Sequence, residues 1–211
     1  RGGSPKDRIC NGRRTWGKGG QLLHCHVKTW GAIHQKSVKS TSVNSALYVL
    51  YNVLGKRRGE VNAMEKLIIT ACICGAEVTK EHNPAVPYTV EEIAKEAKSA
   101  YDAGASIIHL HVREDDGTPT QSKERFEACI NAIKEVCPDV IIQPSTGGAV
   151  GMSNEERLAP TTLRPEMATL DCGTCNFGGD EIFVNTENMI IDFANTMNEY
   201  GIKPEIEVFD K

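Results

Sequence analysis

A regular alternation of strand-like and helix-like segments over residues 64–211 is the feature that most limits what this chain can fold into. Short apolar runs typical of buried strands alternate with segments in which apolar residues recur at helical spacing. The expected strands are 67–73, 106–112, 140–143, 167–170 and 205–209. Because helices separate these strands over short connections, the pattern predicts an α/β protein with a parallel sheet.

Local signals predict where the intervening helices begin and end. Two Ser/Thr-x-x-Glu sequences have the spacing of capping boxes, which begin helices, and two glycines follow helical runs in the position that commonly ends a helix. These residues are Thr89 with Glu92, Ser153 with Glu156, Gly104 and Gly201. Apolar residues at helical spacing over 126–133 and 190–197 mark two of the helices.

A parallel sheet of this kind closes either as a doubly wound open sheet or as a (β/α)8 TIM barrel. The sequence has no G-x-G-x-x-G after the first expected strand, which disfavours a dinucleotide-binding sheet. A complete barrel needs eight strands and roughly 250 residues. We therefore expect a TIM barrel truncated to about five β/α units, preceded by an irregular N-terminal segment.

The first 63 residues differ in character from the rest of the chain. They carry a net charge of +10 and both tryptophans, whereas residues 64–211 carry −14. We expect a domain boundary at Met64, with 1–63 a disordered or non-native basic extension and 64–211 the N-terminal part of a catalytic barrel. A nucleic-acid-binding arm is the alternative, because basic charge and tryptophan suit phosphates and bases, although the acidic body disfavours it.

Two histidines in the second expected strand are the sharpest chemical feature. His109 and His111 are two residues apart, so they project from the same face of a strand, while Ile108 and Leu110 face the opposite layer. Two neutral imidazoles on one rigid strand are suited to hold a metal such as Zn²⁺ with a third ligand from elsewhere. Two hydrogen-bonded core histidines are the alternative interpretation.

Small residues follow the third expected strand, where Ser145, Gly147 and Gly148 lie close together in the sequence. Without large side chains the backbone can approach a ligand, and successive N–H groups can form a site for an anion such as a carboxylate. A simple tight turn explains the same residues equally well.

Acidic and hydroxyl side chains lie at or near the carboxyl ends of other expected strands. They are Glu77 after the first strand, Thr169 and Asp171 at the fourth, and Glu207 within the fifth. Taken singly, each carboxylate is explained by surface charge. An acidic group inside an apolar strand, however, needs a partner or a raised pKa, and all of these residues fall at one end of the sheet.

Composition narrows the class of protein. The chain is 40% hydrophobic and 25% charged, which is typical of a globular domain and unlike a disordered chain or a coiled coil. It has no run of 18 apolar residues and no secretory signal pattern, so we expect neither a membrane partner nor export. Its eight cysteines are expected to be free thiols in a reducing cytoplasm.

Motifs spread over residues 64–211 resemble the β-keto acid cleavage enzyme family. The longest are Ile-Ile-His-Leu-His-Val-Arg-Glu-Asp-Asp-Gly at 107–117 and Ser-Thr-Gly-Gly-Ala-Val-Gly at 145–151. Shorter matches lie at 70–71, 75–77, 143, 157–160, 165–170, 173–174, 176–178 and 204–208. The resemblance implies a zinc-dependent (β/α)8 barrel that acts on a 3-keto acid and acetyl-CoA, giving acetoacetate and a new CoA ester.

The motifs are most similar to the members that cleave 3-keto-5-aminohexanoate in lysine fermentation, with 3-aminobutanoyl-CoA as the second product. By the matched positions, the resemblance implies zinc ligation by His109 and His111, and Glu207 beside the reacting carbon. It also implies that Ser145 and Gly148 bind the carboxylate of the substrate and that Thr169 and position 171 lie near the keto acid. Glu77 is implied to contact the 5-amino group. Asp171 departs from the family pattern, in which Asn is expected.

The resemblance also implies parts that lie beyond Lys211. The family's third zinc ligand is a Glu in the later half of the barrel, where a catalytic Arg-Asp pair is found too. We therefore expect the 211 residues alone to be inactive, and the full-length protein to be a homo-oligomer. The alternative is another divalent-metal barrel, a hydrolase or a class II aldolase-like lyase, although amidohydrolases carry His-x-His on the first strand and not the second.

Overall fold

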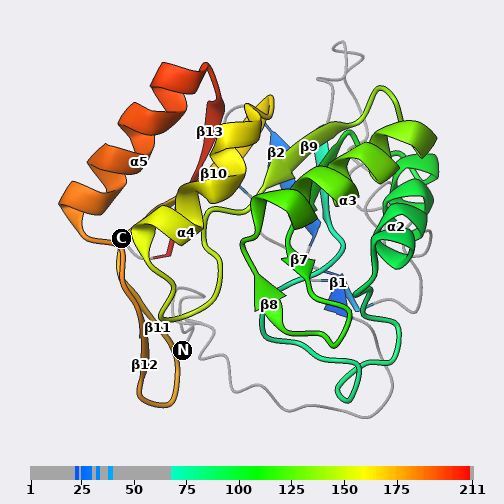
Figure 1. Cartoon of the computed structure of the whole chain (residues 1–211), viewed down its shortest axis with the longest axis horizontal. Coiled ribbons are helices and arrows are strands. Elements are labelled where there is room, and N and C mark those ends of the chain that lie inside the picture. Colours follow the sequence, from blue (N-terminus) through cyan, green and yellow to red (C-terminus); the bar gives the residue numbers. More distant parts are fainter. Residues whose placement is uncertain (1–21, 24, 30–31, 34–37, 40–67, 210–211) are drawn as a thin grey trace, which may run out of the picture.

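The computed structural model describes residues 68–209 and the backbone of residues 22–23, 25–29, 32–33 and 38–39 (Figure 1). The strands of the main body are β5 (Ile68–Cys72), β6 (Ile107–Leu110), β9 (Ile141–Pro144), β10 (Met167–Cys172) and β13 (Lys203–Val208). The helices are α2 (Val90–Asp102), α3 (Lys123–Val136), α4 (Asn154–Leu158), the 3₁₀ helix η1 (Ala159–Leu163) and α5 (Glu187–Tyr200). The predicted strand–helix alternation is confirmed.

Each main strand lies beside the next one along the chain. β5, β6 and β9 are joined by parallel ladders, and β10 pairs in parallel with β13. β10 lies beside β9. The loop after β9 is joined to β10 by Thr146, whose N–H donates to Thr169 Oγ1 at 3.1 Å and whose hydroxyl donates to the Thr169 carbonyl at 2.6 Å. Sequential neighbours are typical of a barrel wall.

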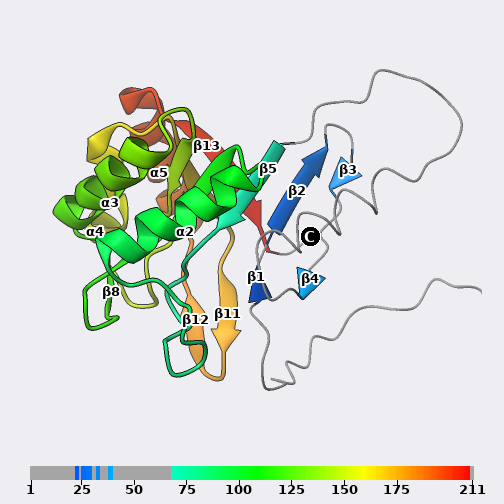
Figure 2. The same cartoon turned by 90° about the vertical axis from the view of Figure 1, so that its right-hand side faces the viewer.

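The helices α2, α3 and α5 lie on the same side of the strands (Figure 2). A doubly wound sheet would place helices on both faces, so the arrangement agrees with the barrel alternative. The described strands form an open portion of such a wall, and the fold is α/β and barrel-like in part. Its completion by further β/α units stays a prediction.

The alternation of side chains along the strands sets up two different faces. Ile108, Leu110 and Ile142 are buried in the apolar core between the sheet and helices α2 and α3. The residues between them, His109 and Gln143, lie opposite each other in the β6–β9 register and so belong to the other face. A second apolar cluster packs α5 on β10. Packing against the helices therefore fixes which residues face away from them.

The capping signals are confirmed. The hydroxyl of Thr89 accepts a hydrogen bond from Glu92 N–H, and Glu92 caps the Thr89 N–H in return. Ser153 and Glu156 form the same reciprocal pair at the start of α4. At the C-terminus of α5, Gly201 has a φ of +71°, a conformation in which a side chain would be strained.

Two hairpins were not predicted. β7 (Val112–Arg113) pairs with β8 (Pro119–Thr120), and β11 (Cys175–Gly178) pairs with β12 (Glu181–Phe183), both antiparallel. The expected strand 106–112 therefore ends at Leu110 in the parallel sheet. The apolar run continues through Val112 because that residue joins the same core from a different pairing.

The N-terminal region contributes β1 (Leu22–Leu23), β2 (Cys25–Thr29), β3 (Ala32–Ile33) and β4 (Val38–Lys39). β2 pairs antiparallel with the free edge of β5, and β1 pairs with β4. The predicted boundary at Met64 and most of the predicted basic extension lie outside the described residues, and both stay predictions. Within the part of the chain that the structure describes, no helix meets the length and apolarity needed to cross a membrane.

Candidate metal and substrate site

His109 and His111 lie side by side, although His111 lies just past the end of β6 and not within the strand, where the sequence predicts it. Their ring centroids are 5.0 Å apart and the ring planes meet at 68°. Burial lowers the pKa of both side chains, and the neighbouring His109 further lowers the pKa of His111, to about 3. Both imidazoles are therefore neutral at pH 7, which is the form that binds a metal ion.

Gln143 and Glu205 continue from the histidine pair toward β13. The Oε1 atom of Gln143 is 3.1 Å from Nδ1 of His109, and its Nε2 donates to Oε2 of Glu205 at 2.9 Å. Gln143 is fully buried and Glu205 is 9% exposed. From the sequence, Glu205 and Glu207 share a face of their strand, so at least one of them is expected to point toward the site, whereas Gln143 has no predicted role. The signal that could have identified Gln143 is an amide side chain at the end of an apolar strand, which needs a hydrogen-bond partner when it is buried.

The loop at 145–148 folds back on itself at the carboxyl end of β9. The hydroxyl of Ser145 accepts a hydrogen bond from Gly147 N–H at 3.1 Å, and Ser145 N–H donates to the Leu110 carbonyl at 2.9 Å. Gly148 has a φ of +63°. The bend and the small residues agree with the predicted anion site, which stays a prediction.

Asp171 and Glu207 lie opposite each other in the β10–β13 register, and Thr169 is paired with Glu205 in the same ladder. An ideal Cβ on Gly147 would lie 3.3 Å from Oδ2 of Asp171 and 3.3 Å from the Ser145 hydroxyl. Burial first, and then the charge of Glu207, raise the pKa of Asp171 to about 6. The structure thus gathers the predicted residues of β10 and β13 around the 145–148 loop.

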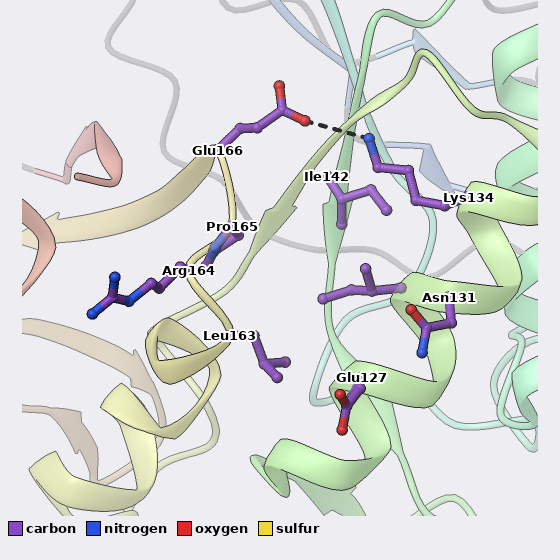
Figure 3. Close-up of a pocket in the computed structure, with 9 residues that line it drawn as sticks. Glu127, Asn131, Lys134, Ile142, Leu163, Arg164, Pro165 and Glu166 are labelled. Carbon is purple, nitrogen blue, oxygen red and sulfur yellow. Dashed lines mark hydrogen bonds and ion pairs between the residues drawn. The ribbon is translucent and has the colours of Figure 1, made fainter. Parts of the chain in front are cut away.

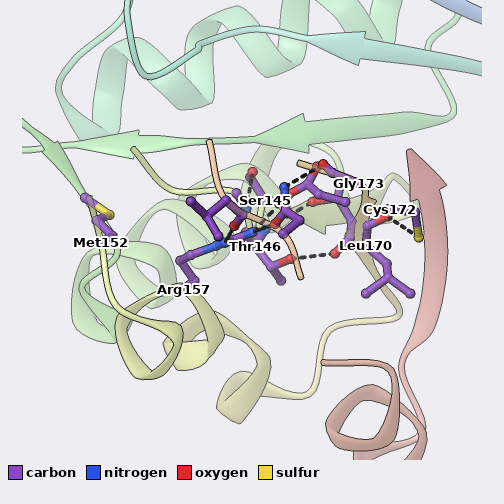
Figure 4. Close-up of polar contacts among 12 residues, drawn as sticks. Ser145, Thr146, Met152, Arg157, Leu170, Cys172 and Gly173 are labelled. Carbon is purple, nitrogen blue, oxygen red and sulfur yellow. Dashed lines mark hydrogen bonds and ion pairs between the residues drawn. The ribbon is translucent and has the colours of Figure 1, made fainter. Parts of the chain in front are cut away.

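Arg157 of α4 links the loop after β9 to β10 and to Asn185 (Figure 4). It has no predicted role from the sequence. Its guanidinium donates to the Thr146 carbonyl at 2.8 Å, to Asn185 Oδ1 at 2.7 Å and to Asp171 Oδ2 at 3.4 Å. It lies between two aromatic rings, those of Phe183 and Phe193, at 4.7 and 5.0 Å from their centroids. Arg157 is 3% exposed, so it is an internal support and not a surface charge.

Glu77 is the exposed member of the predicted set, on the loop that follows β5. The buried Arg113 holds this loop, because its guanidinium donates to the carbonyls of Gly75 and Val78 and, from the other side, to that of Gly117 at 2.9 Å. The ring of Tyr88 packs 5.4 Å from the same guanidinium. The structure fixes the backbone around Glu77 and leaves its carboxylate accessible.

Within residues 68–209 the structure shows no group of three or more His, Cys, Asp or Glu side chains arranged to hold a metal ion. The two imidazoles suit zinc as two members of a ligand set, because burial keeps both neutral and their ring centroids lie 5.0 Å apart. The described cysteines are free thiols, as predicted: Cys72, Cys74, Cys129, Cys137, Cys172 and Cys175.

A separate cavity of about 260 Å³ lies between α3 and the segment before β10 (Figure 3). Leu163, Arg164 and Pro165 line one side, and Lys134 pairs with Glu166 at 3.3 Å across its rim. The cavity is lined from the helix side of the sheet, so it is distinct from the face that carries His109.

Comparison with known proteins identifies the family. The sequence model for beta-keto acid cleavage enzymes matches residues 66–211. The chain belongs to the β-keto acid cleavage enzyme family. It is 82% identical over 148 residues to the 3-keto-5-aminohexanoate cleavage enzymes of Acetoanaerobium sticklandii and Fusobacterium nucleatum, a match that covers 70% of this chain and 54% of each relative. The chain thus spans about half the length of these relatives, which are enzymes.

A more distant member and a solved structure extend the comparison. The 3-oxoadipate:acetyl-CoA acetyltransferase of Cupriavidus necator is 42% identical over 143 residues, covering 68% of this chain and 50% of that protein. The apo structure of ObcA is similar with a TM-score of 0.53 and 23% identity, covering 60% of this chain and 31% of ObcA. The β-keto acid cleavage enzyme resemblance seen in the sequence is confirmed, and the ObcA likeness supports the fold.

Proposed function

We propose that this β-keto acid cleavage enzyme uses zinc to transfer the acetyl group of acetyl-CoA in the cleavage of 3-keto-5-aminohexanoate or a related 3-keto acid. The products are acetoacetate and 3-aminobutanoyl-CoA, or the corresponding acyl-CoA. The observation that carries the proposal is the 82% identity to enzymes of that name over all 148 matched residues. Lysine fermentation in the cytoplasm is the proposed setting, and a homo-oligomer the proposed assembly of the full-length protein.

The histidine pair is the proposed metal-binding part of the site. His109 and His111 would hold Zn²⁺ together with a ligand from outside the described residues. A bound zinc ion supplies Lewis-acid polarisation of the substrate's keto oxygen. The proposed contribution of the protein is to hold both imidazoles in neutral form with their ring centroids 5.0 Å apart, His109 within β6 and His111 just after it.

The 145–148 loop is the proposed carboxylate-binding part. Ser145 and Gly148 would hold the carboxylate of the 3-keto acid, with Thr169 and Asp171 beside its keto group. The hydrogen bonds of Thr146 to Thr169 link this loop to β10, so the two halves of the pocket are held in one geometry. A fixed geometry reduces the entropy lost when the substrate reaches its reactive orientation.

Glu207 and Glu77 are the carboxylates that we propose for catalysis and for substrate recognition. Glu207 projects from the same face of β13 as the buried Glu205, since these residues alternate with the exposed Ile206 and Val208, and we assign it as the catalytic carboxylate beside the reacting carbon. Glu77, on the loop held by Arg113, would pair with the substrate's 5-ammonium group. An acidic partner for that ammonium distinguishes this substrate from 3-keto acids without an amino group.

A chimera tests the proposal. Residues 64–211 would replace the matching 54% of the Acetoanaerobium sticklandii enzyme, and acetoacetate would be measured with 3-keto-5-aminohexanoate and acetyl-CoA. We expect acetyl-CoA-dependent turnover, its loss by at least 10³-fold in His109→Ala, and no turnover by the 211-residue chain alone. A folded, zinc-containing chimera that forms no acetoacetate would refute the proposed reaction.

Substrate choice is tested in the same chimera. Glu77→Gln is expected to raise the KM for 3-keto-5-aminohexanoate about 10- to 100-fold, as expected when a charged hydrogen bond is lost, and to leave the KM for 3-oxoadipate within twofold. The exposed Glu81→Gln, four residues along the same loop, is the matched control. Equal effects of Glu77→Gln on both substrates would contradict the assigned role.

A further inference from the structure

Gln143 is fully buried on the face of the sheet that carries the histidines, and it makes two side-chain hydrogen bonds there. It lies opposite His109 in the β6–β9 register, with Oε1 3.1 Å from Nδ1 of His109. Its Nε2 donates to Oε2 of Glu205 at 2.9 Å. The three side chains form a continuous hydrogen-bonded series from β6 through β9 to β13.

The carboxyl group of Glu205 decides which end of the Gln143 amide faces Glu205 and which faces His109. The amide NH₂ group of Gln143 donates to Glu205, and an ionised carboxylate can only accept, so Glu205 requires this end of the amide. Gln143 then turns its carbonyl oxygen toward His109, and that oxygen also only accepts. Nδ1 of His109 must therefore carry the proton, and Nε2 keeps its lone pair.

We infer that Gln143, oriented by Glu205, is a positioning residue that holds His109 in its Nδ1–H tautomer with Nε2 available to a divalent cation. The inference rests on the proposed zinc site for its functional meaning. The remaining nitrogen of a metal-bound histidine almost always donates to such an acceptor, and removal of the acceptor commonly weakens metal binding 10- to 100-fold.

A purely space-filling role explains these residues less well. Burial of an amide or a carboxylate without a hydrogen bond is costly, so a position that needed only volume would carry Leu or Met. Gln143 is fully buried and Glu205 is 9% exposed, and a hydrogen bond joins them on the face that carries His109. Polar side chains that are buried and paired in this way indicate a role beyond filling space.

The first test reads the tautomer directly in the full 211-residue chain without metal. Long-range ¹H–¹⁵N NMR of ¹⁵N-histidine-labelled protein distinguishes a protonated from an unprotonated ring nitrogen. We expect His109 to be Nδ1–H in the wild type and in the double variant Gln143→Glu with Glu205→Gln, which keeps an acceptor beside His109 and exchanges the donor and acceptor of the other hydrogen bond. We expect the Nε2–H form of His109 to become substantial in Gln143→Leu. In Glu205→Gln we expect a mixture of the two His109 tautomers, because an amide at position 205 no longer fixes the orientation of the Gln143 amide. His82, on an exposed loop, is the internal reference.

The second test measures metal affinity of the same variants in the chimera with the Acetoanaerobium sticklandii enzyme, which supplies the ligand from outside the described residues, by competition of Zn²⁺ or Co²⁺ against a chelating dye. Gln143→Leu should weaken binding 10- to 100-fold, and Gln143→Glu with Glu205→Gln by less than threefold. A wild-type His109 in the Nε2–H form overturns the inference, even if zinc binds. A wild-type Nδ1–H form with no metal binding upholds the tautomer assignment and instead refutes the proposed zinc site. If Gln143→Leu fails to fold, Glu205→Gln carries both measurements.

Discussion

Asp171 lies directly opposite Glu207 in the parallel β10–β13 register, and the two carboxyl groups interact. Burial and this like charge together raise the pKa of Asp171 to about 6, although Arg157 on the other side lowers it. The folded protein therefore binds a proton at Asp171 that the unfolded chain, with a carboxyl pKa near 3.8, has already lost.

The pH dependence of stability follows from that proton. Since the folded state binds more protons between pH 4 and 6, the contribution of Asp171 to the free energy of unfolding falls as the pH rises through this range. Asp171→Asn should therefore gain about 2 kcal/mol of stability relative to the wild type between pH 4.5 and 7.5, at roughly 1.4 kcal/mol per pKa unit. Urea denaturation at the two pH values measures the difference.

A matched variant separates the two causes of the raised pKa. Glu207→Gln removes the neighbouring charge and leaves the burial, so the ¹³C-carboxyl titration of Asp171 should move to a lower pH. Asp139→Asn, at an exposed position, controls for the general loss of one carboxyl. An unchanged Asp171 midpoint in Glu207→Gln would show that burial alone is responsible.

Arg157 is predicted to stabilise the fold through its buried contacts. Arg157→Met leaves Asp171, Asn185 Oδ1 and the Thr146 carbonyl without their donor, and should lower the free energy of unfolding by about 3–5 kcal/mol. Arg157→Met with Asp171→Asn should recover part of this loss, because a neutral amide then replaces the carboxylate that Arg157 contacts. Chemical denaturation measures all three proteins.

The control for this prediction is an exposed ion pair. Lys98→Met removes the partner of Asp102 on α2, where both side chains are well exposed, and should change stability little. Comparable losses in Lys98→Met and Arg157→Met would mean that the buried contacts of Arg157 have no special weight.

Gly148 is predicted to be required for two reasons: its φ is positive, and there is no room for a side chain. A Cβ there would lie 2.8 Å from Met152 Sδ and 3.2 Å from Gln121 Cγ, at a φ of +63°. Gly148→Ala should destabilise the chain by about 2–3 kcal/mol, of which about 1–2 kcal/mol is backbone strain.

Gly151→Ala provides the comparison for Gly148→Ala in thermal or urea unfolding. Gly151 has a φ of +91° but nothing within 4 Å of its Cβ position, so its substitution carries strain alone. The excess loss in Gly148→Ala should shrink when Met152→Ala is added. Equal losses at the two glycines would show that the packing at Gly148 has no energetic consequence.

Arg113 is predicted to order the loop that carries Glu77. Arg113→Lys keeps the charge but cannot reach the carbonyls of Gly75, Val78 and Gly117 with one planar group. Amide hydrogen exchange over residues 75–82 should accelerate at least tenfold, read by mass spectrometry. Arg164→Lys, at an exposed position after η1, is the control and should leave the exchange rates of this segment unchanged. Unchanged exchange rates in Arg113→Lys would show that other contacts hold the loop.

The sequence by itself determined the features that depend on neighbours within a few residues. Thr89 with Glu92 and Ser153 with Glu156 could be assigned as caps because a capping box spans three residues. The shared face of His109 and His111 follows from the two-residue period of extended chain, and the family motifs around them identified the enzyme class.

Only the tertiary structure decided which distant residues support that site. Gln143 is 62 residues from Glu205, and its orientation toward His109 depends on curvature that brings β9 and β13 together across β10. Arg157 looks in sequence like an ordinary charge on a short helix, and its burial between Phe183 and Phe193 appears only when α5 and the β12 hairpin pack on α4. Such contacts are set by the packing of whole elements, whereas periodicity and capping report only on the local chain.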